Sequence, residues 1–205
     1  IEDARRDLDR ALELHPTHLS CYGLTFEPNT ALAQRRELGQ IVPLPDEAMR
    51  AMYESTMAQL AGAGFEHYEV SNWARPGHRC RHNLVYWRND SWLGVGPSAA
   101  SHVTGWRWRN VAHLGRYLRS EGQPPIEDVE HLPPPRRIGE QLMLGLRLRE
   151  GVSWAWLRQT MASDDPRWDI IDQHLERRLL ERSGDRLRLT DDALFIADGV
   201  LETLL

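Results

Sequence analysis

The sequence predicts an α/β fold followed by a small winged-helix-like α+β domain. Segments with the 3.6-residue repeat of helices alternate with short apolar runs typical of strands over roughly the first 70 residues. The last part of the chain contains helices, a short hairpin and a closing helix, which is the outline of a winged-helix-like module. We therefore expect residues 1–132 to form the first domain and residues 133–205 the second.

The elements of the first domain follow from local patterns. Residues 1–14 place apolar side chains at helical spacing and predict an amphipathic helix. An apolar and aromatic run between Pro16 and Pro28 predicts a strand with two apolar faces, as in a parallel sheet covered by helices. Residues 43–64 predict a second helix, and alternation within residues 64–72 predicts a second strand. Parallel strands are the expectation for this order of elements.

Beyond these elements the pattern changes. Residues 73–109 lose periodicity and are rich in glycine, proline and tryptophan, which predicts an irregular segment. Helical patterns return near residues 111–120 and 133–148. The end of the chain predicts a short helix at 153–161, a longer one at 168–182, a turn and strand, and a closing helix.

Composition excludes several classes of chemistry. The 205 residues include 25 cationic and 30 acidic side chains, for a net charge of −5, and every cationic residue is Arg. The absence of Lys excludes a Schiff-base lysine and a phosphate-loop lysine. Only Cys21 and Cys80 are present, so this chain alone cannot supply a four-thiolate zinc site, an iron–sulfur cluster or a disulfide framework. Without an apolar run of about 18 residues or a signal peptide, we expect a cytoplasmic setting.

Residues 73–109 concentrate the groups that suggest function. They hold six Arg and one acid, Asp90, giving +5, and they carry five of the eight Trp and three His. Aromatic faces, guanidinium groups and imidazoles would suit a porphyrin, with its propionates on Arg and its iron on a His. They would also suit single-stranded nucleic acid. A third interpretation is that the Trp side chains fill a core and the Arg side chains are solvated.

Two weaker patterns fall in the same segment. Three residues that can bind metal occupy alternate positions and would share one face of an extended segment: His78, Cys80 and His82. Residues 94–99 match G-x-G-x-x-A, but Pro97 interrupts the pattern, which favours a tight turn with close backbone approach over a dinucleotide site. Residues 133–205 hold 11 Arg and 13 acidic residues, a net charge of −2, which disfavours DNA binding by the predicted winged helix.

Five blocks of the chain resemble one known family. They are HLSCYGLTFEPNT (18–30), LPDEAMRAMY (44–53), GFEHYEVSNWARPGHRCRHNLVYW (64–87), WLGVGPSAASH (92–102) and LMLGLRLREGV (142–152). In this order they are similar to the oxygen-independent coproporphyrinogen III oxidase-like radical SAM proteins. HNLVYW (82–87) matches the HN-x-x-YW motif that marks the haem chaperone branch, often called HemW.

The resemblance implies a fold and a set of cofactors. The fold is the C-terminal half of a radical SAM (β/α)6 partial barrel, ahead of the winged-helix-like domain. The family binds S-adenosylmethionine and a 4Fe-4S cluster through a C-x-x-x-C-x-x-C loop near the N-terminus, and no such loop occurs in this sequence. We therefore expect a C-terminal fragment that lacks radical chemistry of its own.

The resemblance also implies a function and binding residues. The function is that of a haem chaperone, which binds haem and transfers it to an acceptor protein, a membrane-associated one included. His82 would ligate the haem iron, and the remaining haem contacts would come from Asn83, which could orient His82, and from Tyr86 and Trp87. Thr25 and Ala100 would lie against S-adenosylmethionine. Two alternatives stay open: oxidative decarboxylation of coproporphyrinogen III, and a single-stranded nucleic-acid-binding or winged-helix module.

Overall fold

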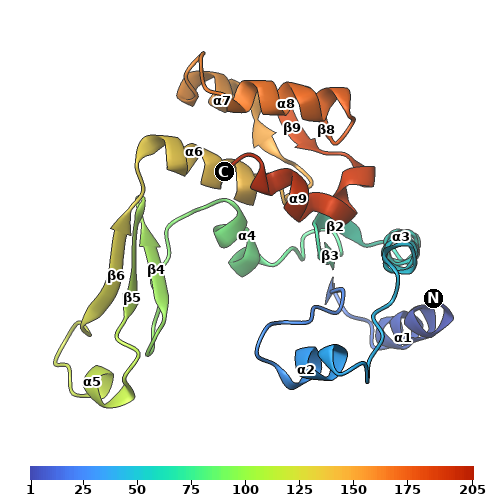
Figure 1. Ribbon diagram of the computed structural model, residues 1–205, viewed down its shortest axis with the longest axis horizontal. Helices are drawn as coiled ribbons and strands as arrows, with labels where there is room; N and C mark the ends of the chain where they lie inside the picture. The colour runs from blue at the N-terminus through green and yellow to red at the C-terminus, as the bar shows by residue number, and fades with distance from the viewer. The chain divides into compact units, whose positions relative to one another are not determined.

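The computed structural model describes residues 1–205, which divide into two units, Ile1–Cys80 and Arg81–Leu205 (Figure 1). Each unit has its own sheets and helices and is described by itself. The domain boundary predicted between residues 132 and 133 lies inside the second unit and stays a prediction. None of the helices is long and apolar enough to span a bilayer.

Three helices belong to the first unit. The predicted N-terminal helix is confirmed as α1 (Glu2–Glu13), which buries Leu8. The helix predicted at 43–64 is α3 (Asp46–Gly62), which buries Leu60. The sequence patterns missed α2 (Ala31–Glu37), a two-turn helix whose N-cap Thr30 accepts a hydrogen bond from the backbone N–H of Ala33.

The sheet of the first unit is antiparallel, so the prediction of parallel strands is wrong here. Its strands are β1 (His18–Ser20), β2 (Glu66–Glu69) and β3 (Asn72–Ala74), in the order β1-β3-β2. The chain reverses directly after β2 and places β3 between the other two strands. The predicted strand between Pro16 and Pro28 pairs over three residues only, and two of its apolar side chains, Tyr22 and Leu24, are exposed.

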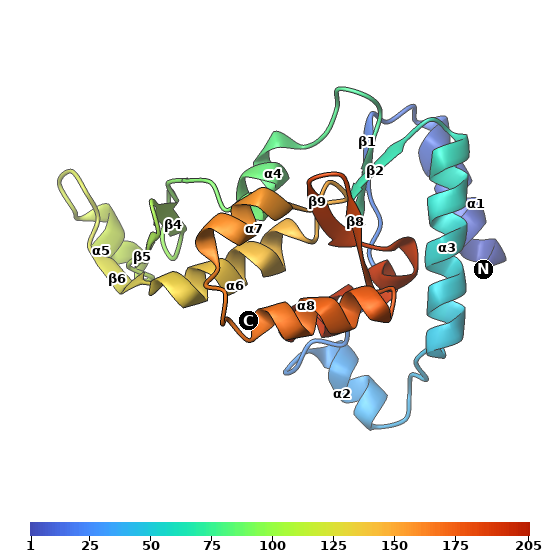
Figure 2. The same cartoon turned by 90° about the horizontal axis from the view of Figure 1, so that it is seen from above.

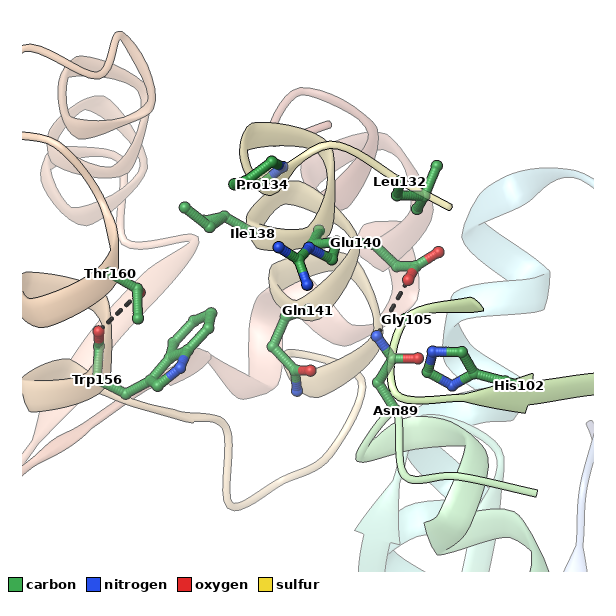
Figure 3. A pocket seen from close by; sticks show the side chains of 11 residues that line it. Asn89, His102, Gly105, Leu132, Pro134, Ile138, Glu140, Gln141, Trp156 and Thr160 are labelled. Atoms are coloured by element: carbon green, nitrogen blue, oxygen red, sulfur yellow. Dashed lines mark hydrogen bonds between the residues drawn. The ribbon is translucent and has the colours of Figure 1, made fainter. Parts of the chain in front are cut away.

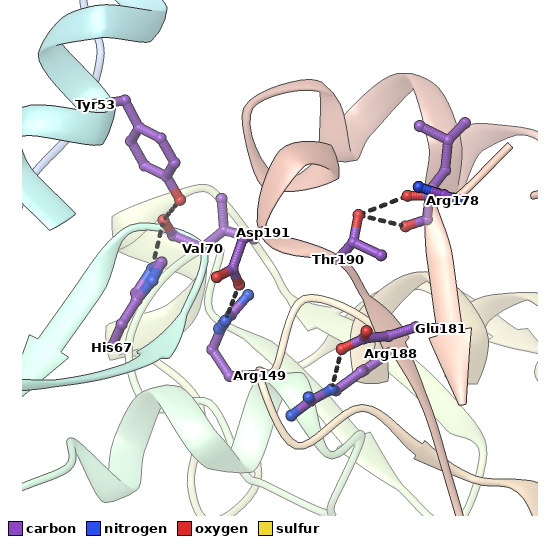
Figure 4. Close-up of polar contacts among 10 residues, drawn as sticks. Tyr53, His67, Val70, Arg149, Arg178, Glu181, Arg188, Thr190 and Asp191 are labelled. Carbon is purple, nitrogen blue, oxygen red and sulfur yellow. Dashed lines mark hydrogen bonds and ion pairs between the residues drawn. The ribbon is translucent and has the colours of Figure 1, made fainter. Parts of the chain in front are cut away.

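The core of this unit joins α1, α3 and the sheet. It contains Leu8, Leu60, Phe65 and Trp73, and the imidazole of His67 stacks on the Trp73 ring at 4.3 Å. The carbonyl of Val70, in the turn between β2 and β3, accepts hydrogen bonds from Tyr53 Oη at 2.7 Å and from His67 Nε2 at 3.2 Å (Figure 4). The turn between β2 and β3 is therefore hydrogen-bonded to α3 through Tyr53.

The second unit begins with α4 (Arg81–Trp87) and an antiparallel sheet, β4-β5-β6. The segment predicted as irregular is thus partly regular. It contains β3, α4 and the hairpin of β4 (Ala100–Val103) and β5 (Trp106–Asn110). Thr104 and Gly105 join the hairpin strands with φ of 48° and 85°, as a tight two-residue turn requires. Trp and Arg alternate over residues 106–109, so the two Trp lie on one face of β5 and the two Arg on the other. This alternation spans only four residues and was not recognised as a strand.

The remaining strand of this sheet, β6 (Ile126–His131), contains a bulge. A short helix, α5 (Leu114–Leu118), precedes it in the segment predicted as a helix at 111–120. Arg107 lies opposite Glu130 and Arg109 opposite Glu127, so two residues of β6 face one residue of β5. The first bulge residue, Asp128, has a φ of 54° and forms an ion pair with Arg109.

The C-terminal part has helices around a second antiparallel sheet, β7-β9-β8 (Figure 2). Its elements are α6 (Pro134–Gly145), β7 (Val152–Ser153), α7 (Trp154–Thr160), α8 (Arg167–Glu176), β8 (Leu180–Ser183), β9 (Arg186–Leu189), the 3-10 helix η1 (Asp191–Ile196) and α9 (Ala197–Glu202). The helix predicted to reach residue 182 ends at Glu176, because Arg178 has a φ of 56° and β8 follows. Leu142, Leu157 and Ile171 are fully buried in its core.

Candidate functional site

The HN-x-x-YW motif forms helix α4. His82 and Tyr86 are four residues apart and therefore lie on one face of the helix, with ring centroids 4.9 Å apart in an edge arrangement. The metal site predicted from an extended segment at 78–82 is wrong, since His82 is already helical. No group of three His, Cys, Asp or Glu side chains in the chain could hold a metal ion.

Tyr86 continues into a row of aromatic rings that leaves the helix. The rings of Tyr86 and Trp92 are 4.7 Å apart, and those of Trp92 and His102 are 4.9 Å apart. Trp92 and His102 exchange two backbone hydrogen bonds, of 2.7 and 3.0 Å, and Trp92 Nε1 donates to the carbonyl of Ala100. The ring row, His82–Tyr86–Trp92–His102, is thus held by the edge of β4 as well as by α4.

The two ends of the ring row differ in exposure. His82 is exposed, whereas His102 is only 5% exposed. The Nδ1 atom of His102 lies 3.0 Å from the carbonyl of Asp90, and since a carbonyl only accepts, Nδ1 donates and Nε2 keeps its lone pair. An imidazole that can reach a ligand in solvent is therefore available at the His82 end.

The other residues predicted for the haem site take different positions. Asn83 is half-buried and forms no hydrogen bond with His82, so the geometry does not contain the orienting contact expected from the sequence. Trp87 is half-buried, with Arg147 5.4 Å from its ring centroid, and its Nε1 is buried without a partner. The helix brings together His82 and Tyr86, while Asn83 and Trp87 lie on a neighbouring face.

The residues predicted to lie against S-adenosylmethionine belong to separate units. Thr25 is exposed in the loop after β1, and Ala100 is exposed at the start of β4. Beside Ala100, a Cβ on Gly94 would lie 2.3 Å from the Ala100 carbonyl oxygen. This close backbone approach confirms the tight-turn interpretation of residues 94–99. The assignment of Thr25 and Ala100 stays a prediction.

The chain's cysteines do not fit an iron–sulfur cluster. Cys21 and Cys80 are both free, and burial raises the pKa of the Cys21 thiol, which disfavours the thiolate that binds metal. Two thiols are fewer than the three that the family's cluster loop supplies.

Sequence reasoning missed His102 as a candidate site residue. It lies in the Arg-rich and Trp-rich segment, but its contact with Trp92 depends on the pairing of residues ten positions apart. The local signals for the hairpin that positions it are the turn at Thr104–Gly105 and the alternation of Trp and Arg over residues 106–109.

Comparisons with known proteins agree with these features. Residues 132–196 match the family model described as HemN C-terminal domain. The whole chain is 38% identical over 206 residues to "Heme chaperone HemW" of Mycobacterium tuberculosis (strain H37Rv), covering 51% of that protein. It is 32% identical over 217 residues to "Heme chaperone HemW" of Escherichia coli K12, covering 54% of that protein.

A solved structure supports the fold. Escherichia coli coproporphyrinogen III oxidase (HemN), described as a radical SAM enzyme, matches with a TM-score of 0.71 and 18% identity, over 96% of this chain and 50% of the other. The chain spans about half the length of the curated relatives it matches. Its motif, its sequence similarity and its fold lead to one conclusion: the chain belongs to the HemW heme chaperone family of HemN-like radical SAM proteins.

Proposed function

We propose that this chain is the haem-binding part of a haem chaperone that transfers haem to an acceptor protein. The observation that carries the proposal is the exposed imidazole of His82, which stands at one end of the ring row in the HN-x-x-YW motif. A neutral imidazole nitrogen is a common axial ligand of haem iron. The curated relatives named as heme chaperones support this function.

Neighbouring side chains suit the rest of a haem molecule. Tyr86 packs against the edge of the His82 ring and restricts its orientation. Arg81 is exposed and forms no ion pair, so its guanidinium is free to pair with a haem propionate. Four of the six Arg within residues 73–109 pair with acidic side chains, which leaves Arg75 and Arg81 without an ion pair.

Exposure of His82 also suits transfer. A single ligand on an exposed helix leaves the second axial position and one face of the haem accessible. An acceptor protein, soluble or membrane-associated, could therefore bind the iron before His82 releases it. Asn83 and Trp87 stay in the proposal as residues that border this site.

The full-length protein would add S-adenosylmethionine and a 4Fe-4S cluster. Thr25 and Ala100 are the residues of this chain that we assign to S-adenosylmethionine. We assign the first part of the chain to half of a radical SAM barrel and residues 133–205 to a winged-helix-like domain. The fold match to HemN supports the assignment of the barrel.

Haem titration of the 205-residue chain, followed by Soret absorbance, tests the proposal. We expect His82→Ala to weaken haem binding at least about tenfold and to change the Soret maximum, because an iron ligand is lost. His78→Ala is the matched control, since His78 is exposed and four residues away in sequence, and it should bind haem like the original chain. Equal binding by both variants would remove His82 as the ligand.

The same preparation separates the alternatives. Tight, strongly salt-dependent binding of a short single-stranded oligonucleotide in place of haem would favour a nucleic-acid module. Decarboxylation of coproporphyrinogen III by the full-length protein would favour the oxidase. Neither result is expected from the exposed histidine site.

A further inference from the structure

A pocket of about 420 Å³ lies within the second unit, away from the exposed end of the ring row. It is bordered by Gly105 of the β4–β5 turn, by α6 and by α7 (Figure 3). The figure shows Trp156 and His102 on opposite sides of the pocket, with Gln141 between them. The end of the ring row that is closed to solvent therefore borders a separate cavity.

Two hydrogen-bond acceptors in the pocket wall have no partner. The Nδ2 atom of Asn89 donates to Glu140 Oε2 at 3.0 Å, which fixes the amide, and its Oδ1 is buried and unpaired. His102 Nε2 carries a lone pair, as derived above from the contact with Asp90, and no protein group hydrogen-bonds to it. A buried acceptor without a donor costs free energy, so Asn89 Oδ1 favours a ligand that carries N–H or O–H groups, and His102 Nε2 offers a second acceptor beside it.

The charges around the pocket favour an anionic group on that ligand. Glu140 forms an ion pair with Arg107 and accepts the hydrogen bond from Asn89, so its charge is compensated. Arg137 lines the pocket, is exposed, and has neither an ion pair nor a side-chain hydrogen bond. An unpaired guanidinium can form a two-hydrogen-bond ion pair with a carboxylate of the ligand.

The remaining wall is apolar and partly flat. Ile138 and the half-buried indole of Trp156 line it, together with Leu132 and Pro134. Such walls contribute affinity through burial of apolar area, and an indole face favours an aromatic ring. A few polar groups set against apolar walls are typical of small-molecule sites.

From these groups we infer that the pocket binds a flat N–H heteroaromatic carboxylate. The ring lies against Trp156 and Ile138, its N–H donates to Asn89 Oδ1 or His102 Nε2, and its carboxylate pairs with Arg137. This inference does not depend on haem binding at His82, because the two sites share no ligating atom.

A series of three probes tests the inference by isothermal titration of the 205-residue chain. Indole-3-acetate has the N–H, the ring and the carboxylate, and it should bind saturably. 1-Methylindole-3-acetate lacks the N–H and should bind about tenfold more weakly, and 3-methylindole lacks the carboxylate and should be weakened similarly. Saturable binding that is equal for the first two probes, or no binding of indole-3-acetate at millimolar concentration, would overturn the inference.

Variants locate the binding. Arg137→Gln should weaken indole-3-acetate about tenfold and leave 3-methylindole unchanged, whereas Arg136→Gln, next to it in α6 but outside the pocket, should change neither. Asn89→Gly removes the amide at a position with a φ of 57° and should reduce the preference for the N–H probe. An Arg137→Gln variant that behaves like Arg136→Gln would place any binding elsewhere. The His82→Ala variant should bind indole-3-acetate normally.

Discussion

His174 shows how the surrounding groups fix the protonation of one buried residue. Thr203 Oγ1 donates to the carbonyl of Val200 at 2.7 Å, so it accepts the hydrogen bond that joins it to His174 Nε2 at 2.8 Å. His174 is therefore protonated on Nε2, and its Nδ1 is buried without a partner. Burial, and secondarily the charge of Arg177, lower the pKa of His174.

This lowered pKa predicts a loss of stability in acid. The unfolded chain binds a proton at His174 more readily than the folded chain does. The free energy of unfolding should therefore fall as the pH drops below about 6.5, and level off below the folded pKa. Urea denaturation at about pH 7.5 and about pH 5.5 measures the effect.

His174→Gln is the comparison for this prediction. Its stability should fall less between the two pH values than that of the original chain. His18, whose pKa is also lowered by burial, is present in both proteins. The difference between their losses of stability therefore reports His174 alone. Equal losses in the two proteins would contradict the assignment.

Among the elements, α8 is joined to α6 through Arg167, which also forms a nearly buried ion pair with Asp165. Arg167, at the start of α8, donates to Asp165 Oδ1 at 2.8 Å and Oδ2 at 2.6 Å, and also to the carbonyl of Pro135 in α6 at 2.8 Å. The two side chains are 9% and 11% exposed. Hydrogen bonds from Arg167 are the main cause of the lowered pKa of Asp165.

Removal of one partner of this ion pair should lower the free energy of unfolding. Asp165→Asn leaves the Arg167 guanidinium buried without a counter-charge and should destabilise the second unit by about 3 kcal/mol. Glu181→Gln is the control, because Glu181 pairs with Arg188 across β8 and β9 in an exposed position and should cost under about 1 kcal/mol (Figure 4). Urea denaturation measures both, and similar losses would refute the prediction.

The elements also show what the sequence could predict. Helices α1, α3 and α6 were found because their apolar spacing is a local property. The prediction that β1 is parallel to its neighbour was wrong, because β1 pairs with β3, which lies more than fifty residues later in the chain. His82 and Tyr86 were named from the motif, but the row that joins them to His102 requires the bridge between Trp92 and His102, which are ten residues apart.

For the whole molecule, the division into two units is itself testable. The unit Arg81–Leu205 has its own buried core and holds both the ring row and the pocket. Expressed alone, it should unfold in one cooperative transition and keep the haem affinity that depends on His82. Circular dichroism with thermal denaturation and the Soret titration measure these properties. A non-cooperative transition would show that this unit needs residues 1–80 to fold.

The bulge in β6 has a consequence for association between molecules. As an outer strand of its sheet, β6 exposes a row of backbone groups that a strand from another chain could extend. Asp128, in its left-handed conformation, bends this row and interrupts its pairing with β5. An incoming strand would meet a broken ladder of hydrogen bonds, so this edge resists growth into fibrils at the concentrations that binding experiments require.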